Sequence, residues 1–155
     1  MTTAERIEDF LNQKRIAIVG VSRNPKELSR GLFRDFVKND YDVVPVNPHV
    51  TEIEGCHCYE SVAQINPPVA GALLMTSPKE INTFVGECLS ANIPRVWIFL
   101  GSGNKDLDPE LASRCRESDV SLINGFCPYM FLPGSGFIHG LHSWFAKRSK
   151  AYRRD

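Results

Sequence analysis

Uninterrupted runs of hydrophobic residues alternate along this chain with segments in which hydrophobic residues recur every three or four positions. Short uninterrupted runs are typical of strands buried on both faces, and the wider spacing is typical of helices that bury one face. The runs predict strands over about 16–20, 42–47, 69–76, 95–101 and 120–123. The spacing predicts helices over about 4–13, 30–39, 79–91, 108–117 and 137–149, with a helical turn near 61–65 and a loop over 48–60.

Several residues mark where the predicted helices begin. Ser29 is expected to cap the helix over 30–39, because a serine side chain can accept a hydrogen bond from the first free backbone N–H groups. Pro78 is expected in the first turn of the helix over 79–91, and Asp108-Pro109 at the start of the helix over 108–117.

This alternation of strands and helices indicates an α/β protein. Right-handed connections between parallel strands place helices on both faces of the sheet. We therefore expect a three-layer αβα, Rossmann-like open parallel sheet of about five strands. The 155 residues fit one domain over 1–155, with a C-terminal helix and a basic tail from about residue 137. Ligands of such sheets bind beyond the carboxyl ends of the strands, where the strand order reverses.

The loop that follows the first strand, residues 20–30, has the composition of an anion site. Three basic side chains and two hydroxyl groups fall within it, on Arg23, Lys26, Arg30, Ser22 and Ser29. Backbone N–H groups at the start of the following helix also attract anions. We expect the loop to bind an anionic ligand, a phosphate. The alternative is a polar surface loop in which Gly20 serves only the turn.

The usual nucleotide-binding motifs are incomplete here. Of the G-x-G-x-x-G pattern only Gly20 is present, and the second strand ends in Val46-Asn47-Pro48, without the acidic residue that holds a ribose diol. The G-K-[ST] of a P-loop is absent from the sequence as well. These absences count against a nicotinamide or flavin cofactor, so a nucleotide must be held differently.

Five segments spread over about residues 14–133 carry a resemblance to a known family: IAIVGVSRNP, VVPVNPHVTEIEGCHCYESV, LLMTSPKE, VWIFLG and GFCPYMFLP. Together they resemble the standalone coenzyme A-binding domains, Rossmann-like proteins related to the alpha subunit of succinyl-CoA synthetase and to acyl-CoA ligases. Val46-Asn47-Pro48, Ile53-Glu54-Gly55 and Tyr59-Glu60-Ser61-Val62 match the V-N-P, I-x-G and Y-x-S-V segments of small members.

The resemblance implies where coenzyme A would bind. The turn from Gly20 to Lys26 would wrap the phosphates, and Val46-Asn47-Pro48 would lie against the adenosine end. Met75-Thr76-Ser77-Pro78 would contact the pantetheine arm, and Gly101 would let backbone approach the ligand. With the basic loop residues, the candidate binding residues are Gly20, Val21, Ser22, Arg23, Lys26, Ser29, Arg30, Val46, Asn47, Pro48, Met75, Thr76, Ser77, Pro78, Gly101 and Cys127.

The chain departs from the synthetase in its first loop and in its domain content. Arg23-Asn24-Pro25 replaces the loop glycines, and His49-Val50 stands where the synthetase has a lysine, so Arg23 or Lys26 would take over phosphate contacts. The ligase domain with its phosphorylated histidine and an ATP-grasp domain are absent from the sequence. We therefore expect a non-catalytic protein that binds coenzyme A or an acyl-CoA. An NAD(P)-dependent oxidoreductase and the coenzyme A-binding subunit of an acyl-CoA ligase stay open as alternatives, as do a homodimer and a ligase partner subunit.

Composition and charge limit the classes of partner that we expect for this protein. Eighteen basic and eighteen acidic residues give zero net charge, which argues against bulk binding of nucleic acid. The sequence has neither a hydrophobic run long enough for a membrane span nor a secretory signal, so we expect a cytoplasmic protein without a membrane partner. The basic tail over 147–155 is expected to be solvated, with weak attachment to an anionic partner as the alternative.

The five cysteines favour neither a metal site nor a disulfide framework. Cys56-His57-Cys58 resembles half of a zinc site, but no second Cys/His pair follows at a suitable spacing. Cys127 lies in a loop at the expected ligand edge, where it is either a small core residue or a thiol facing the thiol of the coenzyme. A nucleophile elbow or a Ser/His/Asp signature is not present in the sequence.

Overall fold

The computed structural model describes residues 1–100 and 107–133, and every structural statement below concerns these residues. In chain order its helices, strands and 3₁₀ turns are α1 (Thr3–Leu11), β1 (Arg15–Val19), α2 (Leu28–Lys38), β2 (Asp42–Val46), β3 (Glu52–Ile53), β4 (Cys56–His57), η1 (Val62–Gln64), β5 (Gly71–Leu74), α3 (Ile81–Ser90), β6 (Arg95–Ile98), α4 (Pro109–Glu117), β7 (Ser121–Asn124) and η2 (Pro128–Met130).

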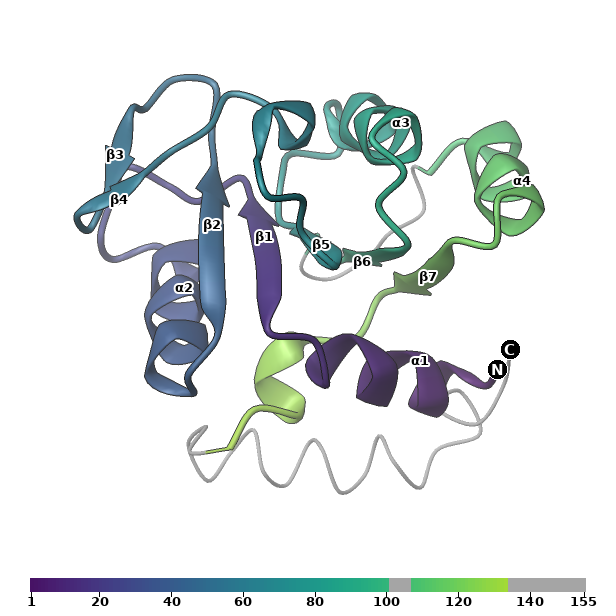
Figure 1. Ribbon diagram of the computed structural model, residues 1–155, viewed down its shortest axis with the longest axis horizontal. Coiled ribbons are helices and arrows are strands. Elements are labelled where there is room, and N and C mark those ends of the chain that lie inside the picture. Colours follow the sequence, from purple (N-terminus) through teal and green to yellow (C-terminus); the bar gives the residue numbers. More distant parts are fainter. Residues whose placement is uncertain (101–106, 134–155) are drawn as a thin grey trace.

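The main sheet has five parallel strands in the order β2-β1-β5-β6-β7 (Figure 1). β1 pairs with β2 along one edge and with β5 along the other. From β1 the chain first builds outward to β2, and from β5 it builds outward in the opposite direction to β7. The strand order therefore reverses between β1 and β5, and the predicted Rossmann-like sheet is confirmed.

Alternate residues of each strand are buried on opposite faces of this sheet. In β1, Ala17 and Val19 belong to the core beneath α3 and α4, whereas Ile16 and Ile18 belong to the core beneath α1 and α2. Figure 1 shows α3 and α4 on one side of the sheet and α1 on the other. Burial on both faces explains the uninterrupted hydrophobic runs of the sequence.

Helix α1 is fixed to the sheet by one ion pair and one aromatic contact. The Arg95 guanidinium donates to the Asp9 carboxylate over 2.7 and 3.2 Å. The Phe10 ring meets the Trp97 ring edge-on, with centroids 5.4 Å apart, and the Trp97 indole N–H donates to the Phe126 carbonyl over 2.9 Å. The polar groups of this half-buried contact are therefore paired with one another or with backbone.

The segment over 48–60, expected to be a loop, contains a short hairpin that the hydrophobic pattern does not predict. β3 and β4 pair antiparallel around Glu54 and Gly55, whose φ angles are 46° and 79°. Positive φ at both turn residues is what a tight two-residue hairpin requires. The Tyr59 carbonyl then accepts from the Asn47 N–H over 2.9 Å, so the hairpin returns beside the end of β2.

The helix starts differ from two of the expectations. The prediction that Ser29 caps α2 is wrong: Glu27 is the N-cap residue and makes no side-chain cap, while the Ser29 hydroxyl accepts from the Ser22 N–H over 2.9 Å. Pro78 precedes α3 instead of lying in its first turn. Asp108 caps α4 as the sequence indicated, and its side chain accepts from the Glu110 N–H. The helix predicted over 137–149 lies outside the described residues.

None of the helices within 1–100 and 107–133 combines the length and the hydropathy of a bilayer-spanning segment.

Gly71 offers a test of how tightly α1 packs on the sheet. A Cβ at this position would lie 2.8 Å from Cε2 of Phe10 and 3.3 Å from Cβ of Arg95. We expect Gly71→Ala to lower the free energy of unfolding by about 1–3 kcal/mol, the usual cost of overpacking, as measured by urea titration. Gly86→Ala is the control, because its Cβ would meet nothing within 4 Å and the change should stabilise α3 by about 0.5–1 kcal/mol. Equal effects at the two sites would contradict this packing.

Candidate functional site

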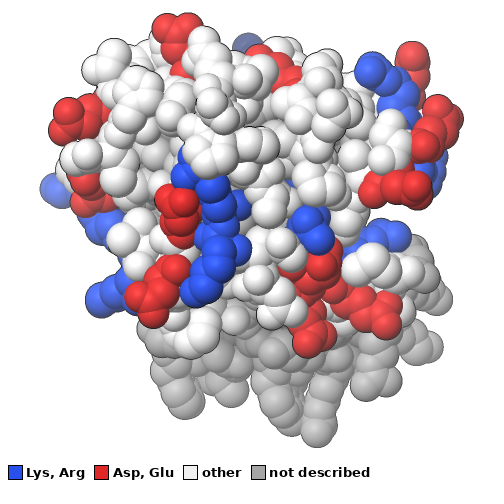
Figure 2. All heavy atoms as spheres, viewed as in Figure 1, with Lys and Arg blue, Asp and Glu red and all other residues white. Residues whose placement is uncertain are grey.

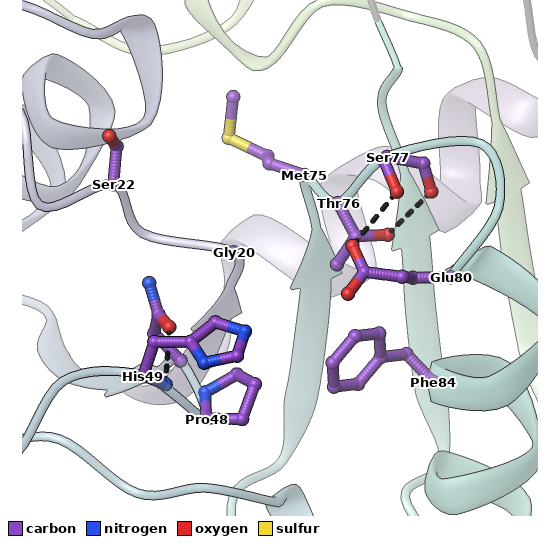
Figure 3. Close-up of a pocket in the computed structure, with 10 residues that line it drawn as sticks. Gly20, Ser22, Pro48, His49, Met75, Thr76, Ser77, Glu80 and Phe84 are labelled. Atoms are coloured by element: carbon purple, nitrogen blue, oxygen red, sulfur yellow. Dashed lines mark hydrogen bonds between the residues drawn. The ribbon is translucent and has the colours of Figure 1, made fainter.

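A cavity of about 230 Å³ opens at the carboxyl edge of the sheet, where the strand order reverses (Figure 3). Its walls come from the segments that follow β1, β2 and β5 and from the start of α3. Residues named as candidates from the sequence line most of it: Gly20, Ser22, Asn47, Pro48, Met75, Thr76 and Ser77. Three further lining residues were not predicted: His49, Glu80 and Phe84.

Where the chain leaves β1 and enters the first loop, the backbone of Gly20 lies close against the backbones of Val46 and Met75. Gly20 has a φ of 91°, and its N–H donates to the Val46 carbonyl over 2.8 Å. A Cβ on Gly20 would lie 2.6 Å from the Met75 carbonyl oxygen. Glycine is therefore required both for the backbone angle and for the close approach of two backbone segments.

Asn47 connects the first loop to the segment after β2. Its side-chain N–H donates to the Val21 carbonyl over 2.8 Å, and its side-chain oxygen accepts from the His49 N–H over 2.8 Å. These two bonds hold Pro48 and His49 at the wall of the cavity, as Figure 3 shows. The asparagine of the V-N-P segment thus shapes the site through the backbone.

The first loop is built from short side-chain-to-backbone turns. The Asn24 N–H donates to the Ser22 hydroxyl over 3.1 Å, and the Lys26 N–H donates to the Asn24 side-chain oxygen over 3.1 Å. The side chains of Arg23 and Lys26 are exposed and lie outside the cavity lining. Along the chain they follow Ser22, which lines the cavity.

Two of the candidate residues of this loop serve its own structure. Ser29 is buried with its hydroxyl on the Ser22 N–H. Arg30 donates to the carbonyls of Ser22 and Arg23, both over 3.2 Å, and its side chain is only 11% exposed. The guanidinium of Arg30 therefore serves the structure of the loop. Arg23 and Lys26 are the exposed basic side chains of the loop.

The opposite wall of the cavity has a different chemical character. The Phe84 ring presents an apolar surface, and the Ser77 hydroxyl donates to the Glu80 carboxylate over 2.8 Å (Figure 3). The Glu80 charge disfavours a phosphate at this wall, while Met75 and Phe84 favour an apolar part of a ligand. The cavity is therefore polar toward the first loop and apolar with one acidic group toward α3.

A second cavity of about 380 Å³ adjoins the first and shares Pro48 and His49 with it. Its far wall contains His57 and Tyr59, whose rings meet edge-on with centroids 4.5 Å apart. Side by side, the two cavities extend from α3, past the ends of β5, β1 and β2, to the β3–β4 hairpin, and we call this pair of cavities the track. A ligand longer than one cavity could follow it.

Residues 14–133 match the family model of the CoA binding domain, a range that contains every residue lining the two cavities. The chain belongs to the CoA-binding domain family. The resemblance found in the sequence is thereby confirmed, and the fold around the cavity is the one expected of such a domain.

This CoA-binding domain has relatives of two kinds. It is 27% identical over 113 residues to the uncharacterized protein YneT of Bacillus subtilis, covering 73% of this chain and 84% of YneT. It is 26% identical over 130 residues to the alpha subunit of an ADP-forming acetate–CoA ligase II of Pyrococcus furiosus, covering 78% of this chain but only 28% of the subunit. The domain therefore spans about a quarter of that ligase subunit.

The similar solved structures are likewise of two kinds, small proteins of about the length of this chain and much longer enzymes. A hypothetical protein from Pyrococcus horikoshii superposes with a TM-score of 0.71 and 27% identity, covering 81% of this chain and 86% of that one. A dinucleotide-forming acetyl-coenzyme A synthetase from Ca. Korarchaeum cryptofilum superposes with a TM-score of 0.67 and 23% identity, covering 77% and 27%. The second likeness supports the fold alone.

The remaining candidate residues of the CoA-binding domain lie elsewhere. Val21 and Val46 are fully buried in the two cores, beneath the site. Pro78 is exposed and outside the cavity lining. Gly101 lies outside the described residues. Cys127 lines neither cavity; it is half-buried and, like Phe126, packs against the core beneath α1 and α2.

Burial makes several thiols of the described residues harder to ionise. Burial raises the pKa of Cys127 and of Cys58, and burial together with the nearby Glu87 raises the pKa of Cys88 to about 12. A thiol with a raised pKa is a poor nucleophile and a poor metal ligand at neutral pH. Among residues 1–100 and 107–133, no group of three or more His, Cys, Asp or Glu side chains is placed to hold a metal ion.

Gly20 and Gly55 form a matched pair for testing the close approach at the site. Both have positive φ angles, 91° and 79°, but a Cβ on Gly55 would meet nothing within 4 Å. We expect alanine to cost more at Gly20 than at Gly55 by about 1–3 kcal/mol, because only Gly20 also faces a backbone carbonyl. Urea unfolding of the two variants measures the difference. Equal losses would mean that the backbone angle alone requires Gly20.

Proposed function

We propose that this protein binds coenzyme A or an acyl-CoA along the track and holds it without catalysing a reaction of its own. The observation that carries the proposal is the cavity at the strand reversal, lined by Gly20, by Asn47-Pro48 and by Met75-Thr76-Ser77. These residues come from three separated segments that match the family, and the fold brings them to one place. Membership in the CoA-binding domain family supports the same ligand.

The chemistry of the walls suggests how the ligand would lie. The phosphates would face the first loop, where Arg23 and Lys26 are exposed and the Glu80 carboxylate is across the cavity. The adenosine end would extend past Pro48 and His49 into the second cavity, whose aromatic groups suit a base. The pantetheine arm would then run over Met75 toward Phe84.

A second candidate function is that of the coenzyme A-binding subunit of an acyl-CoA ligase. The similarity to a quarter of an ADP-forming acetate–CoA ligase subunit favours it. In that case this chain would supply only the coenzyme A site, and a partner chain would bind ATP and activate the acid. Purification of the native protein with its partners distinguishes the two, because only a ligase subunit would bring an ATP-dependent partner with it.

An NAD(P)-dependent oxidoreductase is disfavoured by the same geometry. The end of β2 carries Asn47-Pro48 where a ribose diol needs an acidic residue, and Asn47 is already bonded to Val21 and His49. On the face shown in Figure 2 basic and acidic side chains are interspersed, which suits a small-molecule ligand better than nucleic acid. We propose a cytoplasmic protein with neither nucleic acid nor a membrane as its partner.

Coenzyme A should raise the melting temperature of the protein more than NAD or NADP does. A ligand that binds only the folded state adds a free energy of RT ln(1 + [L]/Kd), about 2.7 kcal/mol at a hundredfold excess over Kd. Thermal unfolding with each ligand at equal concentration measures the effect, and mass spectrometry of the untreated protein identifies any retained ligand. A larger shift with a dinucleotide would contradict the proposal.

The exposed cation Lys26 should contribute to phosphate binding. We expect Lys26→Ala to weaken coenzyme A binding by about 1–2 kcal/mol, roughly 5- to 30-fold, the scale of a hydrogen bond to a charged group. Affinity should also depend less on salt, because one cation fewer meets the phosphates. Calorimetric titration at two salt concentrations tests both effects.

Lys38→Ala is the matched control for this substitution. Lys38 is also exposed, but it lies in the last turn of α2, at the opposite end of the helix. The control should leave the affinity and its salt dependence unchanged. Equal affinities of the two variants would mean that Lys26 points away from the ligand.

A further inference from the structure

The first loop is held from behind by two arginines of α2. Nη1 of Arg30 donates to the carbonyl oxygens of Ser22 and Arg23, each over 3.2 Å. One turn further along the helix, Nη1 of Arg34 donates to the carbonyl oxygen of Pro25 over 3.0 Å. Three carbonyl groups of the loop are thereby turned toward α2.

Both arginines meet the same carboxylate, that of Glu54. Nε of Arg34 lies 2.8 Å from Oε1 of Glu54, and Nε of Arg30 lies 3.5 Å from Oε2. The Arg30 Nε is buried and has no hydrogen-bond partner among the described residues. The Glu54 carboxylate is close enough to compensate the positive charge of this buried group. Without Glu54, two guanidinium groups would face each other beside the loop.

The position of Glu54 is fixed by the hairpin. Glu54 occupies the first of the two turn residues between β3 and β4, and its neighbour Ile53 is buried in the core at 2% exposure. The hydrogen bond from Arg34 lowers the pKa of Glu54 below its usual value, so the side chain is charged at neutral pH. The carboxylate is therefore a fixed negative charge beside both arginines, although it lies 20 or more residues from them in the sequence.

The orientation of the carbonyls decides the orientation of the loop N–H groups. In a trans peptide the C=O of one residue and the N–H of the next point in opposite directions. The Ser22 carbonyl faces Arg30, so the N–H of Arg23 faces away from α2. The N–H groups of Asn24 and Lys26 donate to side chains within the loop, so the arginines fix the shape of the loop and the direction of the Arg23 N–H.

We propose that Glu54 is a positioning residue, which through Arg30 and Arg34 sets the first loop in the shape that receives the phosphates of the ligand. The inference rests on the proposed function for the identity of that ligand. Glu54 lines neither cavity of the track, and with Arg34 it lines a separate cavity against α2. Its effect on a ligand in the track therefore passes through the first loop.

Glu54→Gln tests the inference because it removes the charge and keeps the size of the side chain. Hydrogen exchange of the protein without ligand should become faster over residues 22–27, and calorimetry should show coenzyme A binding about fivefold weaker. Glu54→Asp keeps the charge and should recover most of the affinity. The strands β1 and β5 should keep their protection in both variants.

Asp42→Asn is the matched control. It also removes a carboxylate that pairs with an arginine at 2.7 Å, but the partner is Arg15 at the amino end of the sheet. Exchange over 22–27 and the affinity for coenzyme A should both stay as in the wild type.

The two readouts separate the inference from the proposed function. If exchange over 22–27 is unchanged in Glu54→Gln, the inference is wrong whatever the binding result. Faster exchange with unchanged affinity, or a loss of protection throughout the sheet, would also overturn it. If the wild-type protein does not bind coenzyme A, the proposed function fails, while faster exchange confined to 22–27 would still show that Glu54 sets the loop.

Discussion

The backbone contact between Gly20 and Met75 is the constraint on which the site depends. β1 is paired with parallel partners on both edges, so the chain that leaves it must pass between the ends of β2 and β5. The space beside the Met75 carbonyl accepts only a glycine. Past this point the first loop turns toward α2 on one face, whereas the segment after β5 leads to α3 on the other. The cavity lies where these two paths separate.

The basic side chains near this cavity have different roles, which a count of charges in the sequence does not show. The sequence counts Arg23, Lys26 and Arg30 alike as basic residues of the first loop. In the fold Arg30 is turned inward onto loop carbonyls and Glu54, and only the other two remain exposed. Across the cavity Glu80 adds a negative charge. Electrostatics therefore gives the track a direction, with its positive side at the first loop and its negative side at α3.

The features that the sequence predicts are those that depend on neighbouring residues, and the features that it misses depend on contacts between residues far apart in the chain. The five strands were predicted because burial on both faces leaves an uninterrupted hydrophobic run. The β3–β4 hairpin was missed because two residues per strand are too few to show a period. Ser29 was misassigned because its preference for a helix start is local, whereas its bond to Ser22 depends on how the loop folds back. Phe84 and Glu80 were missed because the side of α3 that meets the cavity depends on how the predicted helix packs on the sheet.

The family segments become intelligible once each residue is assigned its physical task. In Ile53-Glu54-Gly55 the first residue anchors the hairpin in the core, the second orders the two arginines, and the third allows the turn. In Val46-Asn47-Pro48 the valine is buried in the sheet, the asparagine bonds to the first loop, and the proline lines both cavities. Of these six residues only Asn47 and Pro48 line the cavities of the track. Each segment connects the core to the first loop or to the cavity wall, so the shape of the site is set by residues that stand behind it.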